Sequence, residues 1–357
     1  MEHVYVGTTN LDSTGSATNL NESNAAKVIK EGEIFYANED YQGGTLNALV
    51  INDAYGVNAT SFVQWNDRGT KEIKIDASDK NILVHNFVDV DINAQDSTNG
   101  LTVQVTHAKR GEIETGAGDD VVHISLFSNN TNWVNQFNVS TNAGNDRLTI
   151  DHLQNTQFTA FYIDTGTGDD NVDLSSVHAQ ANVNLANRII ELGEGNDTLI
   201  ASQGNDVING GLGADKLQAG YGDDTVLFDA NDQSVDGGEG FDALVTQHEH
   251  SNVVLDDRVS GFEAVVGGQG LLDDVTVSLG DTDGLFVAAL GNDSGDVLNI
   301  EGGWQRIETS EITELTAAHI NILSQAGANT DSLQAYVYEL DGQQTTVWTD
   351  LDLASIL

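Results

Sequence analysis

The chain has 357 residues, and its 56 acidic against 13 basic side chains give it a formal charge of -43. This self-repulsion opposes a compact state unless a cation is bound, and it excludes nucleic acid and anionic membrane surfaces, because both are bound through Lys and Arg. Cys and Pro are absent, so neither disulfides nor zinc–thiolate sites hold the fold, which leaves a hard cation as the candidate. No run approaches the roughly 20 apolar residues of a membrane helix, so membrane insertion is not expected.

Residues 1–60 are rich in Asn, Thr, Ser and Ala, and apolar residues alternate with polar ones in TLNALVIND at 45–53. Alternation with a period of two is typical of a half-buried strand. We therefore predict a β-rich N-terminal segment that begins the fold and caps the open end of the repetitive region next to it. Its first residues, MEHVYVGTTNLDSTGS, lack the basic and apolar parts of a signal peptide.

Residues 61–190 repeat a rhythm of strand, turn and strand, which predicts irregular rungs of a parallel β-solenoid with long coils. Two early turns lack glycines, so Asp79 and Asp96 are predicted to be solvated turn residues rather than metal ligands. The rhythm is seen in KIDASDKNILV (74–84), DINAQDSTNGLTVQV (91–105) and EIETGAGDDVVHISL (112–126).

One unit, x-G-x-G-x-D-x-U with U apolar, recurs eight times between residues 115 and 244. The copies are TGAGDDVV, TNAGNDRL, TGTGDDNV, LGEGNDTL, SQGNDVI, GGLGADKL, AGYGDDTV and GGEGFDAL. Their key acids, separated by 26, 24, 27, 9, 9, 9 and 18 residues, are Asp120, Asp146, Asp170, Asp197, Asp206, Asp215, Asp224 and Asp242.

The chemistry of this unit suits a calcium ion. Glycines at alternate positions permit the positive φ of a tight turn and let carbonyls point inward, while the Asp places a carboxylate at the end of the turn. Carbonyl and carboxylate oxygens are the ligands that calcium prefers. The turn backbone is predicted at Gly116, Gly118, Gly144, Gly166, Gly168, Gly193, Gly195, Gly204, Gly211, Gly213, Gly220, Gly222, Gly238 and Gly240.

The nine-residue spacing resembles the nonapeptide repeat of the calcium-binding RTX proteins, clearly over residues 192–244 and more loosely back to about 111. The resemblance implies an all-β fold in which residues 191–245 form a calcium β-roll. Two nonapeptides make one flattened coil with a turn on each edge, and calcium sits between stacked turns on the same edge.

This geometry sorts the key acids into two columns. Counting in steps of 18, Asp206, Asp224 and Asp242 share one edge, while Asp197 and Asp215 share the other. The longer spacings fit single coils, so Asp120, Asp146 and Asp170 continue the Asp197 column. A site between each adjacent pair predicts about four plus two calcium ions, about six in all. Beyond Asp215, DANDQ at 229–233 has lost both glycines, so that column is predicted to weaken or end there.

Residues 246–357 are predicted to form a β-rich C-terminal cap without the metal turn. DVLNIEGGW at 296–304 predicts a closing hairpin, and ELTAAHINILSQAGA at 314–328 has apolar residues at mixed helical spacing. The chain ends in TDLDLASIL, where acids precede small and apolar residues. This tail resembles the uncleaved C-terminal signal of type I secretion; an ordinary capping strand is the alternative.

Sequence patterns for catalysis are absent. His248 and His250 in QHEHSN lie two residues apart rather than in H-E-x-x-H, and G-x-S-x-G and a Cys nucleophile are both missing. An EF-hand loop fails in DVDINAQDSTNG at 89–100, because Ala94 stands where the sharp turn needs Gly. We therefore expect no enzyme activity.

Taken with the resemblance, these features predict a non-enzymatic calcium-binding RTX region that folds on extracellular calcium after type I secretion. It would belong to a bacterial surface adhesin or similar exported protein, at the cell surface or outside the cell, exported without an N-terminal signal peptide. The expected partners are calcium and the type I secretion machinery. Two alternatives are a calcium-dependent surface-layer protein and the secretion or folding region of an RTX enzyme or toxin.

Overall fold

The computed structural model divides the chain into two compact units, unit 1 (Met1–Thr198) and unit 2 (Leu199–Leu357). The division falls next to the point where the sequence changes from long coils to nonapeptides. None of the described helices is long and apolar enough to span a bilayer. The structure describes residues 3–9, 27–30, 35–37, 48–53, 72–76, 81–85, 89–108, 110–126, 135–152, 159–177, 188–246, 251–267, 273–282, 284–291 and 296–353.

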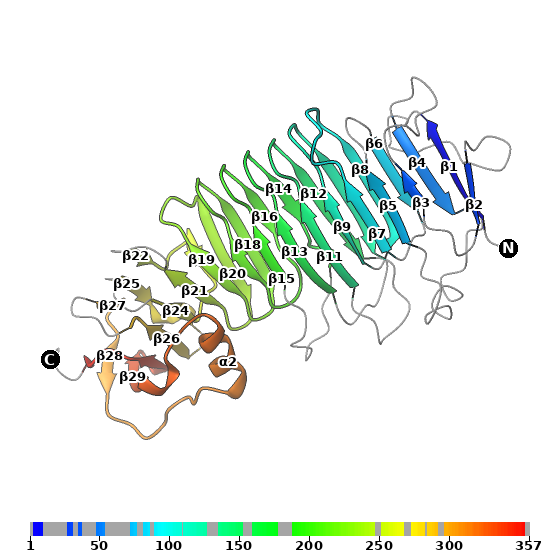
Figure 1. Cartoon of the computed structure of the whole chain (residues 1–357). Helices are drawn as coiled ribbons and strands as arrows, with labels where there is room; N and C mark the ends of the chain where they lie inside the picture. Colours follow the sequence, from blue (N-terminus) through cyan, green and yellow to red (C-terminus); the bar gives the residue numbers. More distant parts are fainter. Residues whose placement is uncertain are drawn as a thin grey trace. The chain divides into compact units, whose positions relative to one another are not determined.

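Unit 1 consists of strands that alternate between two sheets, so that each coil of the chain contributes one strand to each sheet (Figure 1). One sheet has the order β2 (Lys27–Lys30), β1 (His3–Thr9), β4 (Ala48–Asp53), β6 (Asn81–His85), β8 (Thr102–Ala108), β10 (Val121–Leu126), β12 (Arg147–His152) and β14 (Asn171–Asp173). The other has β3 (Phe35–Ala37), β5 (Glu72–Asp76), β7 (Asp89–Asn93), β9 (Arg110–Glu114), β11 (Asn135–Ser140), β13 (Thr159–Asp164) and β15 (Arg188–Glu191).

The core of unit 1 lies between these sheets, where apolar residues of successive coils stack in parallel register. Val122 pairs with Leu148, and Leu148 pairs with Val172. In the other sheet Phe137 pairs with Phe161. All five side chains are at most 2 % exposed, because strand alternation directs every second residue inward. The predicted parallel β-solenoid is confirmed.

The N-terminal strands differ from the rest of unit 1 in direction. Strand β1 pairs antiparallel with β2 and with β4, and the parallel stack begins where β4 pairs with β6. The described part of residues 1–60 is therefore strand, as predicted. Asp96 is an exposed turn residue, and Asp79 lies outside the described residues.

Unit 2 begins with shorter coils. Val207 pairs with Thr225 and Thr225 with Ala243, each 18 residues apart, and Lys216 pairs with Ser234. Strand β16 (Thr198–Ile200) lies at the boundary of the units, and within unit 2 the first sheet has β18 (Lys216–Tyr221), β20 (Ser234–Glu239) and β23 (Val259–Ser260). The second sheet has the order β17 (Val207–Asn209), β19 (Thr225–Phe228), β21 (Ala243–Thr246), β24 (Ala264–Val266), β26 (Leu285–Ala289), β30 (Gln343–Thr349), β29 (Gln334–Leu340) and β28 (Gln305–Ile307).

The predicted hairpin at 296–304 is wrong. Strand β27 (Val297–Glu301) joins a separate parallel sheet with β22 (Ser251–Val254) and β25 (Asp273–Ser278), whereas β28 pairs with β29. Gly302 and Gly303, with φ of 86° and 80°, turn the chain between the two strands. This left-handed backbone sends the second strand to another sheet rather than back along the first.

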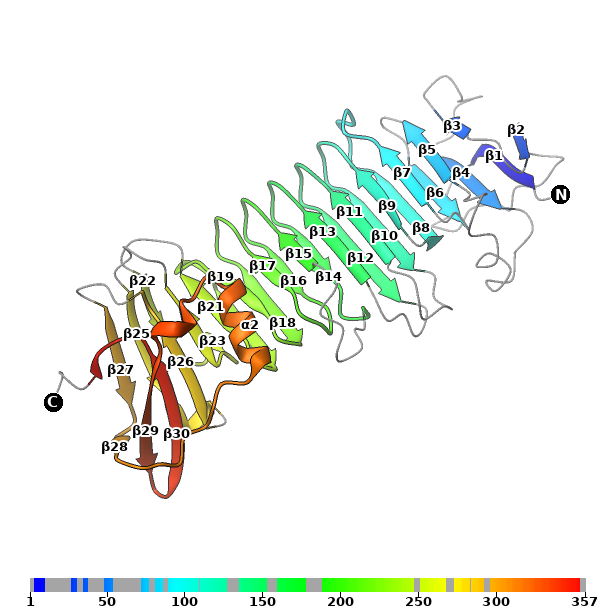
Figure 2. The same cartoon turned by 60° about the horizontal axis from the view of Figure 1, so that its bottom comes forward.

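Helix α2 (Ala317–Gln325) lies within the segment predicted to be helical and crosses the strands of unit 2 (Figure 2). Thr316 caps its N-terminus and forms a capping box with His319. Strand β30 pairs in parallel with β26, and the Asp350 carboxylate then accepts hydrogen bonds from the backbone of Leu290 and Gly291, both at 2.9 Å. The chain from β30 to Leu353 is thus part of the folded cap; residues 354–357 lie outside the described residues. Two short 3-10 helices, Leu279–Asp281 and Thr330–Ser332, complete the described elements.

Candidate metal centre

The stacked turns of unit 1 leave room only for glycine at their close approaches. Gly166 and Gly168 have φ of 88° and 132°, and a Cβ on either would collide with the carbonyl oxygen of Asn142 or Gly144 in the preceding turn. Between them Thr167 donates its backbone N–H to the carbonyl of Asn142 at 2.8 Å. Asn142 itself stands where other turns have the first glycine and adopts φ of 62°, a conformation that Asn tolerates.

The predicted turn glycines mostly adopt this conformation. Gly116 and Gly204 do not, although a Cβ on Gly116 would still collide with the backbone of Ser97. Positive φ is found at Gly118, Gly144, Gly166, Gly168, Gly193, Gly195, Gly211, Gly213, Gly220, Gly222, Gly238 and Gly240.

Four key acids of unit 1 form a continuous chain of hydrogen bonds, which we call the inner ladder. The backbone N–H of each donates to Oδ1 of the key Asp in the next turn, at 2.8 Å from Asp120 to Asp146, 2.7 Å from Asp146 to Asp170 and 2.7 Å from Asp170 to Asp197. Asp120 in turn accepts from the backbone of Leu101 at 2.6 Å. The structure therefore brings these acids into one column.

Unit 2 contains a second inner ladder. The backbone of Asp206 donates to Asp224 and that of Asp224 to Asp242, both at 2.7 Å. Asp242 donates to the carboxylate of Glu263 at 3.0 Å, so a glutamate stands where the motif would place the next Asp. Asp215 is also buried in unit 2. Because Asp197 belongs to unit 1, its predicted sharing of a column with Asp215 stays a prediction.

The key acids are buried with oxygen atoms left over. All eight are at most 2 % exposed. Among the described residues, Oδ2 of Asp120, Asp146, Asp170 and Asp242 has no hydrogen-bond partner. Buried carboxylate oxygens are costly unless a partner or a metal ion satisfies them. A row of such oxygens therefore calls for cations.

Burial changes the acidity of these carboxylates. Loss of solvent is the largest cause, and it raises the pKa of Asp146 to about 6, of Asp170 to about 7 and of Asp242 to about 8, against an ordinary value of 3.8. The pKa of Asp120 is raised for the same reason. The inner-ladder hydrogen bonds act in the opposite direction, because a backbone N–H stabilises the ionised form.

The donor set fits calcium. No three or more His, Asp or Glu side chains within the described ranges gather around one point, so an ion must also draw on backbone carbonyls. The carbonyls of Gly118, Gly144 and Gly168 take no part in the rung-to-rung bonds and face the glycine of the next turn. Carboxylates with carbonyls form the oxygen set of a calcium site. When bound, calcium would neutralise the carboxylates and tie neighbouring turns together.

A second ladder, the outer ladder, was not foreseen from the sequence. The residue before each key acid accepts a hydrogen bond from the backbone of its counterpart in the next turn, as from Asn145 to Asp119 at 2.9 Å and from Asp169 to Asn145 at 2.8 Å. Asn196 donates to Asp169 at 2.8 Å, and Asp223 donates to Asn205 at 3.0 Å. The recurrence of Asp or Asn before the key Asp was the available signal.

A comparison with protein families matches residues 191–226 to the RTX calcium-binding nonapeptide repeat, in four copies. No curated protein and no solved structure matches the chain. The matched segment includes the turns that carry Asp197, Asp206, Asp215 and Asp224. His248 and His250 lie outside the described residues. The chain thus carries the calcium-binding nonapeptide repeats of the RTX proteins.

Proposed function

We propose that this chain is a non-enzymatic region of an exported bacterial protein, one that is unfolded until extracellular calcium folds it. The observation that carries the proposal is the inner ladder, in which buried carboxylates keep an oxygen without a hydrogen-bond partner at Asp120, Asp146, Asp170 and Asp242. Without a cation these groups oppose folding. With calcium bound, the same groups join the turns.

The energetic scale supports a switch. Extracellular calcium modules bind with dissociation constants of about 0.1 to 1 mM, so several sites fill together outside the cell and stay empty inside. A site at 100-fold saturation adds roughly 2.7 kcal/mol to the folded state. About six sites, even when each is far from saturation, exceed the margin of about 5 to 15 kcal/mol that holds a typical domain.

The proposal extends to export and adhesion. An acidic chain that stays expanded in calcium-poor cytoplasm suits passage through a narrow type I exporter. The acidic and apolar composition of TDLDLASIL supports a C-terminal secretion signal. A rigid β-roll outside the cell suits a surface adhesin or a similar exported protein, whose ligand would be bound by another part.

Far-ultraviolet circular dichroism of the whole chain tests the proposal. In EGTA we expect a disordered spectrum, and in millimolar calcium a β-sheet spectrum that reverts when EGTA is restored. Potassium chloride at matched ionic strength is the control, because it screens charge without ligating the turns. A fully folded spectrum in EGTA, unchanged by calcium, would refute the proposal.

Self-assembly into a surface layer is a second candidate, supported by large apolar side chains on the calcium turns. Leu212 and Tyr221, each between two turn glycines, are 62 % and 61 % exposed. Light scattering against calcium discriminates the two, because a module stays monomeric whereas a lattice protein grows. Leu212→Ser with Tyr221→Ser should abolish any such growth without changing the calcium-induced circular dichroism.

A further inference from the structure

The turn 229–233 has the sequence DANDQ and no glycine, yet it continues the stack of unit 2. In the motif turns, the residue after a key acid donates its N–H to the carbonyl of the preceding key acid, as Thr225 does to Asp206 at 2.9 Å. Ser234 makes the same bond to Asp215, at 3.1 Å. Gln233 therefore occupies the key position by register, but its side chain is exposed.

Asp232 takes over the role that Gln233 leaves. It is 2 % exposed, and backbone N–H groups of Asp229 and Asp215 donate hydrogen bonds to its carboxylate, the first to Oδ2 at 3.3 Å. The bond from Asp215 repeats the inner-ladder bond that Asp224 makes to Asp242. The carboxylate has thus moved one residue back along the chain while keeping its place in the ladder.

This carboxylate has an unmet need. Among the described residues Oδ1 of Asp232 has no hydrogen-bond partner, and the neighbouring Asp215 side chain is fully buried. The basic side chain at this turn is Arg258, whose Nη1 donates to the carbonyls of Ala230 at 3.2 Å and Asp232 at 2.8 Å. The guanidinium holds the outer backbone of the turn, and it forms no ion pair with the Asp232 carboxylate.

The turn is also held in shape without glycine. The carboxylate of Asp229 accepts from the backbone and side chain of Asn231, at 2.9 and 2.8 Å, and the Asp232 N–H donates to the Asp229 carbonyl at 3.1 Å. Such an Asx turn mimics a backbone turn. An acid-rich turn replaces a glycine-rich one, and a buried carboxylate faces the next key acid in both.

We infer that Asp232 and Asp215, with backbone carbonyls of their turns, bind a calcium ion, so that this column of sites runs one turn beyond the nonapeptide motif. The inference rests on the proposed calcium-dependent folding. Burial and the adjacent Asp215 carboxylate raise the pKa of Asp232 to about 7, in line with the key acid Asp170. The column predicted to weaken at 229–233 instead continues through an acid that the glycine pattern does not mark.

Equilibrium dialysis of the whole chain against calcium counts the ions bound at saturation. We compare the wild type with Asp232→Asn, which keeps shape and hydrogen-bond acceptor but loses the charge. Asp257→Asn is the matched control, because Asp257 is exposed on the next coil. We expect Asp232→Asn to bind one calcium ion fewer per chain than the wild type, and Asp257→Asn to bind the same number.

Equal counts in all three proteins would overturn the inference and leave the proposed function standing, whereas a wild type that binds no calcium would overturn both. Circular dichroism in calcium shows whether Asp232→Asn folds. If it does not fold, a crystal structure of the wild type grown in calcium decides the matter. Density for an ion between Asp215 and Asp232 supports the inference, and a vacant position between them refutes it.

Discussion

Around each key acid, two ladders run in opposite directions. The Asp146 carboxylate accepts from the turn before it, whereas the Asn145 side chain accepts from the turn after it. Each turn is therefore tied to both neighbours by side-chain hydrogen bonds as well as by backbone bonds. The inner ladder uses one oxygen of each carboxylate, and the other is left for an ion. Support and ligation are thus divided between adjacent residues.

The outer ladder also separates like charges. Its members in unit 1 alternate as Asp119, Asn145, Asp169 and Asn196. Like charges directly opposite one another on neighbouring strands are destabilising. Placing a neutral amide between two carboxylates keeps every acceptor of the ladder while halving its charge. This arrangement holds the turns together without demanding calcium of its own.

Replacing Asp170 by Asn tests the inner ladder at one residue. The amide oxygen can still accept from Asp146, but the charge that attracts calcium is lost. We expect a higher calcium midpoint for folding, equivalent to losing up to roughly 2.7 kcal/mol for a site that was 100-fold saturated. A calcium titration followed by circular dichroism measures it. Asp173→Asn, on the half-buried end of β14, is the control, and an unchanged midpoint for Asp170→Asn would contradict the assignment.

The raised pKa values predict how acid affects the calcium-free chain. Because the folded pKa values of Asp146, Asp170 and Asp242 are about 6, 7 and 8, above the ordinary 3.8, the fold binds more protons than the unfolded chain between these limits. Its stability is therefore greatest below 3.8 and is lost as the pH rises through 6 to 8. In calcium-free buffer we expect the β-sheet signal to grow as the pH is lowered from 8. A signal that falls or stays constant would exclude these shifts.

At single positions, the sequence predicted what repeats. Each key acid and the apolar residue two places after it were marked by spacing, and the latter are buried, as Val172 and Ile208 show. Asp232 was missed because register alone points to Gln233. Which of two neighbouring side chains faces inward depends on the local turn, and an Asx turn reverses it without changing the count of residues.

At the scale of elements, helix α2 explains an irregular copy of the motif. GGEGFDAL has Phe241 where other copies have Asp or Asn before the key acid. Phe241 accepts no side-chain hydrogen bond, so the outer ladder stops there; its ring instead stacks on His319 of α2, with centroids 4.3 Å apart. Helical spacing predicted this element, but its packing partner came from 70 or more residues earlier in the chain.

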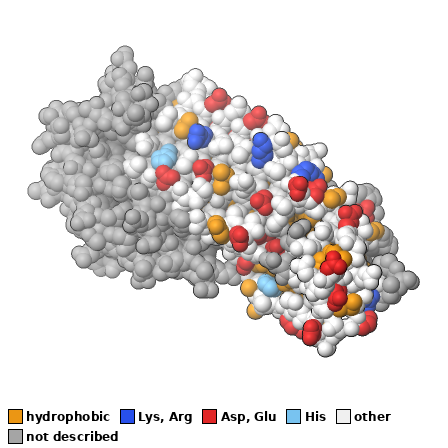
Figure 3. All heavy atoms as spheres, turned by 180° about the vertical axis from the view of Figure 1, so that it is seen from behind, with side chains coloured by type: hydrophobic (Ala, Val, Ile, Leu, Met, Phe, Trp, Pro, Cys, Tyr) orange, Lys and Arg blue, Asp and Glu red, His pale blue; other side chains and the backbone are white. Residues whose placement is uncertain are grey.

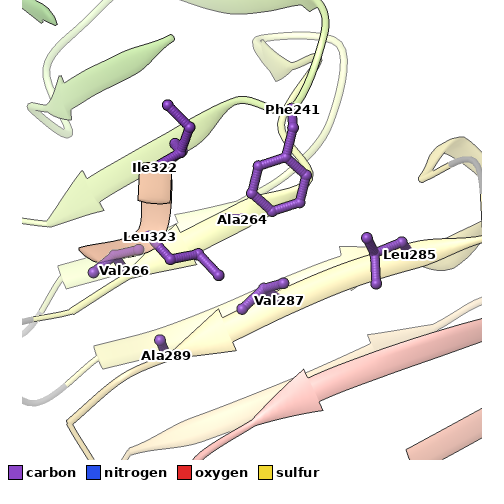
Figure 4. Close-up of a cluster of buried hydrophobic side chains, with 9 residues drawn as sticks. Phe241, Ala264, Val266, Leu285, Val287, Ala289, Ile322 and Leu323 are labelled. Atoms are coloured by element: carbon purple, nitrogen blue, oxygen red, sulfur yellow. The ribbon is translucent and has the colours of Figure 1, made fainter. Parts of the chain in front are cut away.

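The helix is anchored by Ile322 and Leu323, which pack on Phe241 and the strands β24 and β26 (Figure 4). Leu323 is fully buried, whereas Ile320 on the same helix is 41 % exposed. We expect Leu323→Ala to lower the free energy of unfolding by about 2 to 5 kcal/mol, and Ile320→Ala to change it by less than about 0.5 kcal/mol. Urea denaturation in saturating calcium measures both. Equal losses would show that α2 is not held through this cluster.

At the scale of the whole molecule, coil length separates two kinds of rung. Parallel pairing holds in both, but the register advances by 24 or 26 residues in unit 1 and by 18 in unit 2. The spacing of the key acids predicted this difference. The fate of β27 and β28 was not predictable in the same way, because short strands separated by glycines carry no signal of which sheet they will join.

The net charge of -43 has two parts with different physics. Acidic side chains are spread over the face shown in Figure 3, where salt can screen them over a Debye length of about 8 Å. The inner-ladder carboxylates are buried, so bulk salt does not reach them. Relief of surface repulsion alone should therefore not fold the chain.

This division predicts cation selectivity. Calcium accepts irregular sets of six to eight oxygens, whereas magnesium demands near-octahedral geometry and keeps its water molecules. Stacked turns with buried carboxylates and carbonyls offer little room for those waters. We expect millimolar calcium to produce the β-sheet circular dichroism, and magnesium at the same concentration or sodium chloride at matched ionic strength to leave the chain largely unfolded. If magnesium folds the chain at the same midpoint as calcium, charge neutralisation rather than dry ligation at the inner ladder drives the transition.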